Sequence, residues 1–172
     1  MSQKHFAPLF KSFTWLREHK AIDAKCERVL KMISRRYKRV LVAGNEGSGK
    51  NTVANAIFAH WHTLGREAVF TPTFECKTPG GLWTHPSFKS YRSFFTSGQP
   101  LITPFQYDQD LYCEQYVPEL FKSGRNFDVI VDCRRLPDGT RIVAQVFCRR
   151  GQSWNCIYRS PMFASLQIGQ AA

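Results

Sequence analysis

The chain is poor in acids, in long apolar runs and in paired cysteines. Its 172 residues carry 13 Asp and Glu against 24 Lys and Arg, which gives a formal net charge of +11. This imbalance favours a polyanionic neighbour bound through a basic surface: nucleic acid, an acidic protein partner or a membrane surface. No apolar run approaches the roughly 20 residues that a membrane-spanning helix needs, so no membrane span is expected. The oligomeric state stays open.

The six cysteines show no C-x-x-C spacing, so the sequence does not indicate a zinc site. No secretory signal pattern precedes them. This predicts reduced thiols in a reducing intracellular compartment, which is either the cytoplasm or, for a viral protein, the interior of the host cell. The first 17 residues contain three basic side chains and no acid. That pattern keeps import into an organelle as an alternative.

The most informative stretch lies at residues 44–52. Gly44, Gly49 and Lys50 fit the phosphate-binding pattern G-x-x-x-x-G-K-[ST] up to its last letter, where Asn51 stands instead. An apolar run at 39–43 precedes the loop, and apolar residues at helical spacing follow it. A strand before the loop and a helix after it are the context that a phosphate-binding loop requires. Backbone N–H groups and the helix dipole then favour an anion.

These residues define the predicted site, with ATP and Mg²⁺ as the predicted cofactors. The catalytic groups are Lys50, which reaches the terminal phosphates, and Asp132, which ends an apolar run at 127–131. The Mg²⁺ ligands are Asn51, through its amide oxygen, and Asp132, as the acid at a strand's carboxyl end. A strand-end Asp can equally cap a turn. The predicted nucleotide contacts are Gly44, Asn45, Glu46, Gly47, Ser48, Gly49, Lys50, Asn51 and Thr52.

The pattern as a whole predicts an α/β fold with three layers, a mainly parallel sheet and a P-loop. A basic helical extension is expected at 1–37 and the nucleotide-binding domain at 38–172. The remaining expectations are a strand at 68–70, irregular chain at 71–88, a helix at 107–121, a hairpin of 141–148 with 153–158, and a loosely ordered tail at 165–172.

Two clusters allow two interpretations each. The basic run at the end of the extension is either a solvated helix end or a patch for phosphates. Aromatic side chains in the irregular stretch either anchor a loop or stack on a base. The residues are Lys31, Arg35, Arg36, Lys38 and Arg39 in the first cluster, and Trp83, His85 and Phe88 in the second.

The loop from Gly44 to Lys50 resembles that of thymidylate kinases, which carry an acid followed by Gly-Ser/Ala-Gly-Lys. Further similar elements, among them Pro79-Gly80-Gly81 and the run 129–132, extend the resemblance over about residues 38–145. The resemblance implies phosphoryl transfer from ATP to a nucleoside monophosphate. It places Glu46 near the sugar of the acceptor, and Asp132 in the family's Asp-Arg-Tyr/His motif.

The chain departs from that family at several points. Cys133 follows Asp132 where the family has Arg, and Lys77-Thr78 replaces an Arg-Glu pair. The chain ends soon after the predicted hairpin, so the family's arginine-bearing lid is expected to be missing; Arg149 and Arg150 are candidate substitutes. Two other functions therefore stay open. One is a degenerate kinase fold acting as a structural or nucleic-acid-binding module in a nucleoprotein assembly. The other is a nucleic-acid-dependent ATPase of the viral helicase type.

Overall fold

The computed structural model describes residues 11–76, 93, 97–107 and 127–170. Its centre is a seven-stranded sheet with the order β2-β4-β1-β5-β6-β7, in which β3 also pairs with β4. The strands are β1 (Arg39–Gly44), β2 (Val69–Phe70), β3 (Phe74–Cys76), β4 (Leu101–Tyr107), β5 (Val129–Arg135), β6 (Arg141–Arg150) and β7 (Ser153–Arg159). The helices are α1 (Phe13–Glu18), α2 (Ala24–Arg36), α3 (Lys50–Thr63) and α7 (Pro161–Gln170).

The pairing of the strands confirms the mainly parallel sheet. Strand β1 runs parallel to both β4 and β5, and β4 runs parallel to β2 and β3. Strands β6 and β7 continue the sheet as antiparallel neighbours, which confirms the C-terminal hairpin. Because parallel strands end at the same edge, the loop after β1 lies beside the carboxyl ends of β4 and β5, where α/β proteins build their sites.

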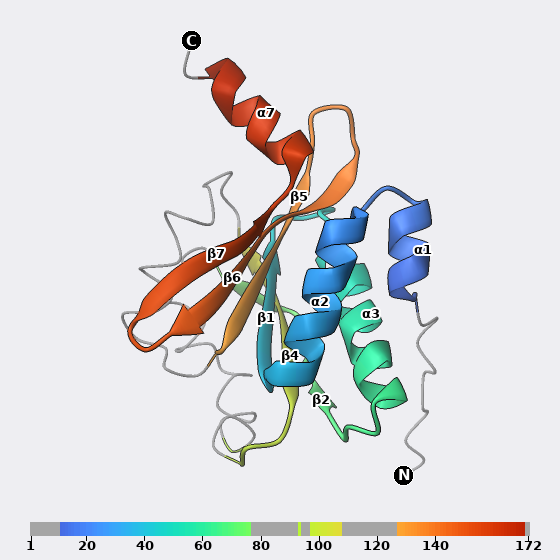
Figure 1. Ribbon diagram of the computed structural model, residues 1–172, viewed down its shortest axis with the longest axis vertical. Coiled ribbons are helices and arrows are strands. Elements are labelled where there is room, and N and C mark those ends of the chain that lie inside the picture. The colour runs from blue at the N-terminus through green and yellow to red at the C-terminus, as the bar shows by residue number, and fades with distance from the viewer. Residues whose placement is uncertain (1–10, 77–92, 94–96, 108–126, 171–172) are drawn as a thin grey trace.

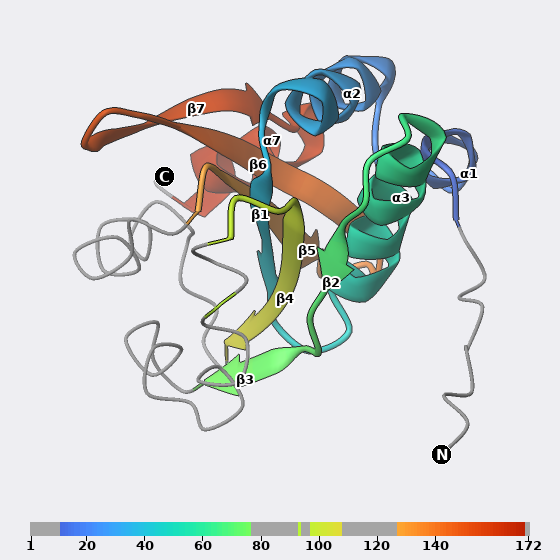
Figure 2. The same ribbon diagram turned by 90° about the horizontal axis from the view of Figure 1, so that it is seen from below.

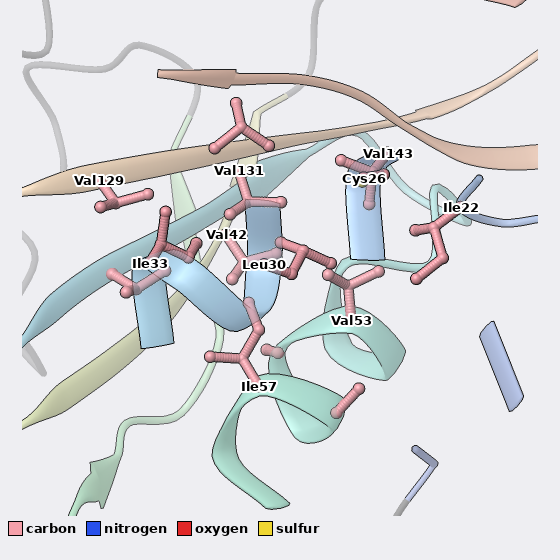
Figure 3. Close-up of a cluster of buried hydrophobic side chains, with 14 of the residues drawn as sticks. Ile22, Cys26, Leu30, Ile33, Val42, Val53, Ile57, Val129, Val131 and Val143 are labelled. Carbon is pink, nitrogen blue, oxygen red and sulfur yellow. The ribbon is translucent and has the colours of Figure 1, made fainter. Parts of the chain in front are cut away.

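Helices α1, α2 and α3 lie together on one face of the sheet (Figures 1 and 2). Leu30 and Ile33 of α2 and Ile57 of α3 are fully buried in one cluster with Val42 and Val131 of the sheet (Figure 3). These side chains recur at helical spacing in the sequence, so the amphipathic pattern identified the face that docks. The N-terminal helices are therefore packed on the sheet. The boundary between residues 37 and 38 stays a prediction.

Polar contacts fix both ends of α2. Asp23 accepts a hydrogen bond from the backbone N–H of Cys26 at 2.6 Å, as an N-cap does. At the other end, Arg66 donates to the carbonyl oxygens of Arg35 and Tyr37. Glu27 forms ion pairs with Arg17 of α1 and with Lys31, and the Lys31 hydrogen bond lowers the pKa of its carboxyl group.

Strand β4 was not predicted, although it lies in the middle of the sheet. Its sequence contains Pro104, and a proline ordinarily argues against a central strand. The structure shows how the proline is accommodated. Leu101 donates its N–H to Lys38 on the β1 side, and N–H groups alternate along a strand, so position 104 faces away from β1. On that side β2 ends at Phe70 and β3 begins only at Phe74, so no ladder bond is lost there.

The structure corrects the expected tail and the start of the expected helix at 107–121. The tail was expected to be loosely ordered, but α7 runs through Gln170, with Phe163 buried against Ile142 and Ala144. The expected helix at 107–121 is wrong at its first residue, because Tyr107 belongs to β4, and its remainder lies outside the described residues. Trp83, His85 and Phe88 also lie outside them, as do residues 77–81 of the kinase resemblance. No helix of the described ranges is long and apolar enough to cross a membrane.

Docking of α2 on the sheet predicts a large effect of Leu30→Ala. The side chain is fully buried, whereas Leu64 at the end of α3 is 38% exposed. Leu30→Ala is expected to lower the free energy of unfolding by about 2–5 kcal/mol through cavity formation. Leu64→Ala, the same change at an exposed site, should cost less than about 1 kcal/mol. Urea unfolding measures both, and equal small effects would show that α2 is not part of the folded core.

Candidate phosphate-binding site

The loop between β1 and α3 has the backbone form of a phosphate cradle. Gly47 adopts φ +70° and Gly49, the residue that precedes α3, adopts φ +85°, a region that favours glycine. The first helical hydrogen bond runs from Val53 N to Gly49 O at 3.1 Å. The N–H groups of the three residues before Val53 therefore point out of the helix end, where an anion binds.

Gly44 is packed tightly against Ser48 of the loop and against Cys133 at the end of β5. A Cβ atom at this position would lie 2.3 Å from Ser48 Oγ and 2.6 Å from the carbonyl oxygen of Cys133. Both distances are far below van der Waals contact, so only glycine lets the loop fold back against the end of β5. The first glycine of the sequence motif is therefore required for packing.

Lys50 is buried at the mouth of the loop, with 5% of its surface exposed. Its ammonium donates to Gln106 Oε1 at 2.7 Å and to the carbonyl oxygen of Asn45 at 3.3 Å. Both acceptors are neutral oxygens, so neither cancels the charge of the lysine. Gln106 stands at the carboxyl end of β4, level with Gly44, and the sequence analysis did not single it out.

The two predicted metal ligands lie in different surroundings. Asn51 is exposed at the start of α3, and its amide oxygen accepts a hydrogen bond from Thr73 Oγ1 at 3.1 Å. Asp132 is fully buried and forms an ion pair with Arg134 Nε at 3.0 Å. No cluster of three or more His, Cys, Asp or Glu side chains suited to a metal ion occurs among the described residues.

The register of the sheet also determines which way Asp132 faces. Asp132 is level with Ala43, and Cys133 is level with Gly44. Cys133 belongs to the cluster under α2 and α3, and successive side chains of a strand point to opposite faces, so Asp132 faces away from these helices. Lys50, by contrast, reaches Gln106, which shares the face of Cys133. A metal role for Asp132 stays a prediction.

Arg135 and Arg141 lie against the loop, and the sequence analysis did not assign them a role. A Cβ atom on Gly47 would be 3.6 Å from Arg135 Nη1, and one on Gly49 would be 3.6 Å from Arg141 Cβ and Cδ. The two arginines are opposite each other where β5 and β6 join in a hairpin. The signal was present in the sequence, because a Pro-Asp-Gly turn flanked by Arg at both ends predicts that the two side chains meet at its base.

The arginines proposed earlier as substitutes for the lid are placed elsewhere. Arg149 donates its backbone N–H to Asp128 O, just before β5 begins, and Arg150 is paired with Ser153 at the turn into β7. This end of β6 is opposite to the end that meets the loop. Arg149 and Arg150 therefore do not approach the phosphate-binding loop.

The remaining predicted residues differ in exposure. Glu46 is exposed on the loop, Thr52 is half-buried in the first turn of α3, and Ser48 is 1% exposed. The hydroxyl of Ser48 has no hydrogen-bond partner within the described residues. Cys133 is buried beside the loop, and burial raises the pKa of its thiol, with the charge of Asp132 adding to the shift.

The comparisons with known proteins add little to this geometry. No family model and no curated protein matches the chain. Among solved structures it is similar to the VirB11 ATPase from the Brucella suis type IV secretion system, crystallised in complex with sulphate. The identity is 19% and the TM-score 0.46, over 84% of this chain and 59% of that chain. The chain thus spans less than two thirds of the length of that ATPase, and a likeness this distant carries no argument about function. The strand–loop–helix geometry described above is what makes this a P-loop α/β fold.

The contacts of Gly44 predict that Gly44→Ala lowers the free energy of unfolding by about 1–3 kcal/mol, the usual cost of overpacking. Ser48→Ala, which removes the buried hydroxyl, should be close to neutral. The double variant should recover only part of the loss, because the Cys133 carbonyl still clashes with the new methyl group. Urea unfolding of the three variants tests this, and wild-type stability of Gly44→Ala would contradict a rigid loop.

Proposed function

We propose that the protein binds ATP, with the phosphates held in the loop of residues 44–52. The observation that carries this proposal is the buried ammonium of Lys50 at the mouth of a loop whose glycines adopt positive φ. An ammonium held at this position is a charge-assisted donor, and a phosphate oxygen is a strong acceptor for it. The N-terminus of α3 adds N–H donors and a favourable dipole.

The finer proposal is phosphoryl transfer from ATP to a nucleoside monophosphate, as the kinase resemblance implies. Such a reaction needs cations around the transferred group, where negative charge is spread over its oxygens. Lys50, Arg135 and Arg141 all border the loop and supply that charge. In this proposal Glu46, exposed on the same loop, lies beside the sugar of the acceptor.

The second candidate is nucleotide binding without transfer, which a specific observation favours. P-loop enzymes hold Mg²⁺ with a hydroxyl after the lysine and an acid at a neighbouring strand end. Here Asn51 follows Lys50, and the strand-end residue that contacts Lys50 is Gln106. Two amides form a weaker site for Mg²⁺ than a hydroxyl and a carboxylate, because Mg²⁺ is ordinarily bound through carboxylates. This candidate agrees with a degenerate kinase fold in a nucleoprotein assembly.

A nucleic-acid partner is the corresponding proposal for the basic surface. Arg35, Arg36 and Lys38 are exposed at the end of α2, whereas Lys31 and Arg39 of the same run form ion pairs with carboxylates. If these exposed cations contact phosphates, affinity for nucleic acid falls steeply with salt. ATP turnover that DNA or RNA stimulates would favour the ATPase of the viral helicase type instead.

Calorimetric titration with ATP tests the main proposal. Lys50→Ala is expected to weaken ATP binding about 10- to 100-fold, because a charge-assisted phosphate contact is lost. Lys38→Ala, the same change at an exposed position, is the control and should leave the affinity unchanged. Equal affinity of wild type and Lys50→Ala would refute the proposal. Where ATP binds, transfer of labelled phosphate to a nucleoside monophosphate supports the kinase. ATP binding with neither transfer to any acceptor nor ATP turnover, with or without nucleic acid, supports the binding module.

The amide at position 51 generates a separate prediction on the metal. Asn51→Ser restores the hydroxyl that ordinarily holds Mg²⁺, so ATP binding is expected to gain Mg²⁺ dependence, measured by titration with Mg²⁺ and with EDTA. Asn55→Ser, the same substitution one turn later in α3, should not change it. Identical Mg²⁺ dependence of the two variants would show that residue 51 does not contact the metal.

A further inference from the structure

A cavity of about 230 Å³ lies directly beside the phosphate-binding loop. One wall comes from α1 and the segment that follows it, the second from the loop and the first turn of α3, and the third from the β5–β6 hairpin. The lining includes Trp15, His19, Ala21, Thr52, Val53 and Arg141. The N-terminal helix thus contributes to a concave surface at the loop, a role that its sequence does not indicate.

The cavity continues the phosphate site. Lys50 donates to Gln106, and Gly49 and Thr52, which are close to it in the sequence, form part of the cavity wall. The outward N–H groups at the start of α3 belong to residues 50–52, the last of which lines the cavity. A phosphate chain that starts at Lys50 and crosses the helix end therefore arrives at Thr52, with its next group at the cavity. Arg141 lines the cavity, and its Cβ and Cδ atoms lie against Gly49, so this side chain stands at the junction of the loop and the cavity.

The lining has the chemistry of a pocket for a flat, weakly polar group. Leu16, Val53 and Ile142 are apolar and buried. Trp15 is held in place by His19, which stacks on it with 3.8 Å between ring centroids, and by Lys11, whose ammonium lies 4.2 Å from the ring centroid. The buried hydroxyl of Ser48, without a partner in the described part of the chain, supplies a hydrogen-bonding group in the same lining.

The size and charge of the cavity restrict its occupant. Drug-sized ligands fill pockets of roughly 300–1,000 Å³, so a cavity of about 230 Å³ suits one part of a nucleotide and not the whole. Within the part of the chain that the structure describes, no carboxylate is among the lining side chains. Guanine presents two adjacent donors, N1–H and its N2 amino group, which a carboxylate can accept together, whereas adenine presents only its N6 amino group on that edge.

We propose that this cavity binds the base of the nucleotide whose phosphates the loop holds, and that it prefers adenine to guanine. The proposal rests on the ATP-binding function proposed above. It assigns α1 and the β5–β6 hairpin to base recognition, with Trp15, Leu16, Val53 and Ile142 around the ring. The phosphates are then bound by the loop and the cations beside it, and the base adds its own share of the affinity.

Binding of inorganic tripolyphosphate, ATP and GTP to the full chain separates the two contributions. The affinity for tripolyphosphate measures the contribution of the phosphate-binding loop. The ratio of the ATP affinity to the tripolyphosphate affinity measures the contribution of the cavity. Ala21→Leu extends a larger side chain into the cavity, and Ala24→Leu, the same change at the exposed start of α2, is its control. We expect wild type to bind ATP at least about tenfold more tightly than tripolyphosphate or GTP. Ala21→Leu should reduce the ATP affinity to that of tripolyphosphate, and Ala24→Leu should not.

The other outcomes are distinct. Equal affinities of wild type for ATP and tripolyphosphate would overturn the base pocket and leave phosphate binding by the loop intact. So would an unchanged ATP-to-tripolyphosphate ratio in Ala21→Leu. GTP binding as tight as that of ATP would overturn the preference for adenine. Failure of wild type to bind either ATP or tripolyphosphate would overturn the ATP-binding function and the base pocket together. Unchanged tripolyphosphate binding in Ala21→Leu shows that this variant is folded.

Discussion

The site depends on the close approach of the chain at Gly44. The residue ends β1, and the loop that follows packs back against Ser48 and the Cys133 carbonyl with no room for a side chain. Because Gly44 is level with Gln106 on one neighbouring strand and Cys133 on the other, the turn is fixed relative to both strand ends. Because α3 begins directly after this loop, the turn also fixes the position of the start of α3 and of the Lys50 ammonium.

The positive charges around the loop come from side chains of the protein, Lys50, Arg135 and Arg141. Lys50 is hydrogen-bonded to neutral oxygens, and Arg135 and Arg141 approach the loop glycines from the hairpin. The acid that the motif led us to expect, Asp132, faces the other side of the sheet and is paired with Arg134. Fixed cations and backbone N–H groups around the loop favour an anion there.

Local patterns predicted the parts of this fold that depend on local physics. The apolar run before the loop, the glycines, the helix after it and the C-terminal hairpin are all confirmed, because strand and helix periodicity and turn chemistry act over a few residues. Helix α3 ends at Thr63, and Gly65, two residues later, adopts φ +69°. The motif also identified Lys50 and the loop correctly as one structural unit.

What the sequence could not show depends on which strands become neighbours. Pro104 argued against a strand at β4. The gap between β2 and β3 that accommodates this proline exists only in the assembled sheet, so the sequence alone does not show it. Gln106 contacts Lys50 across 56 positions of the chain, and nothing local marks it. The orientation of Asp132 follows from the register with Ala43. The Pro-Asp-Gly turn predicts that Arg135 and Arg141 meet, but their approach to the loop depends on where the hairpin lies in the assembled sheet.

The hairpin has one further consequence. Arg135 and Arg141 are directly opposite across β5 and β6, and like charges in such pairs destabilise a sheet. An anion seated over the adjacent glycines turns that repulsion into attraction for both side chains. Occupancy of the loop and closure of the hairpin are thus thermodynamically linked, and amide protons at this end of the sheet would exchange more slowly as the concentration of the bound anion rises. The ligand would then act as a missing structural element of the β5–β6 turn.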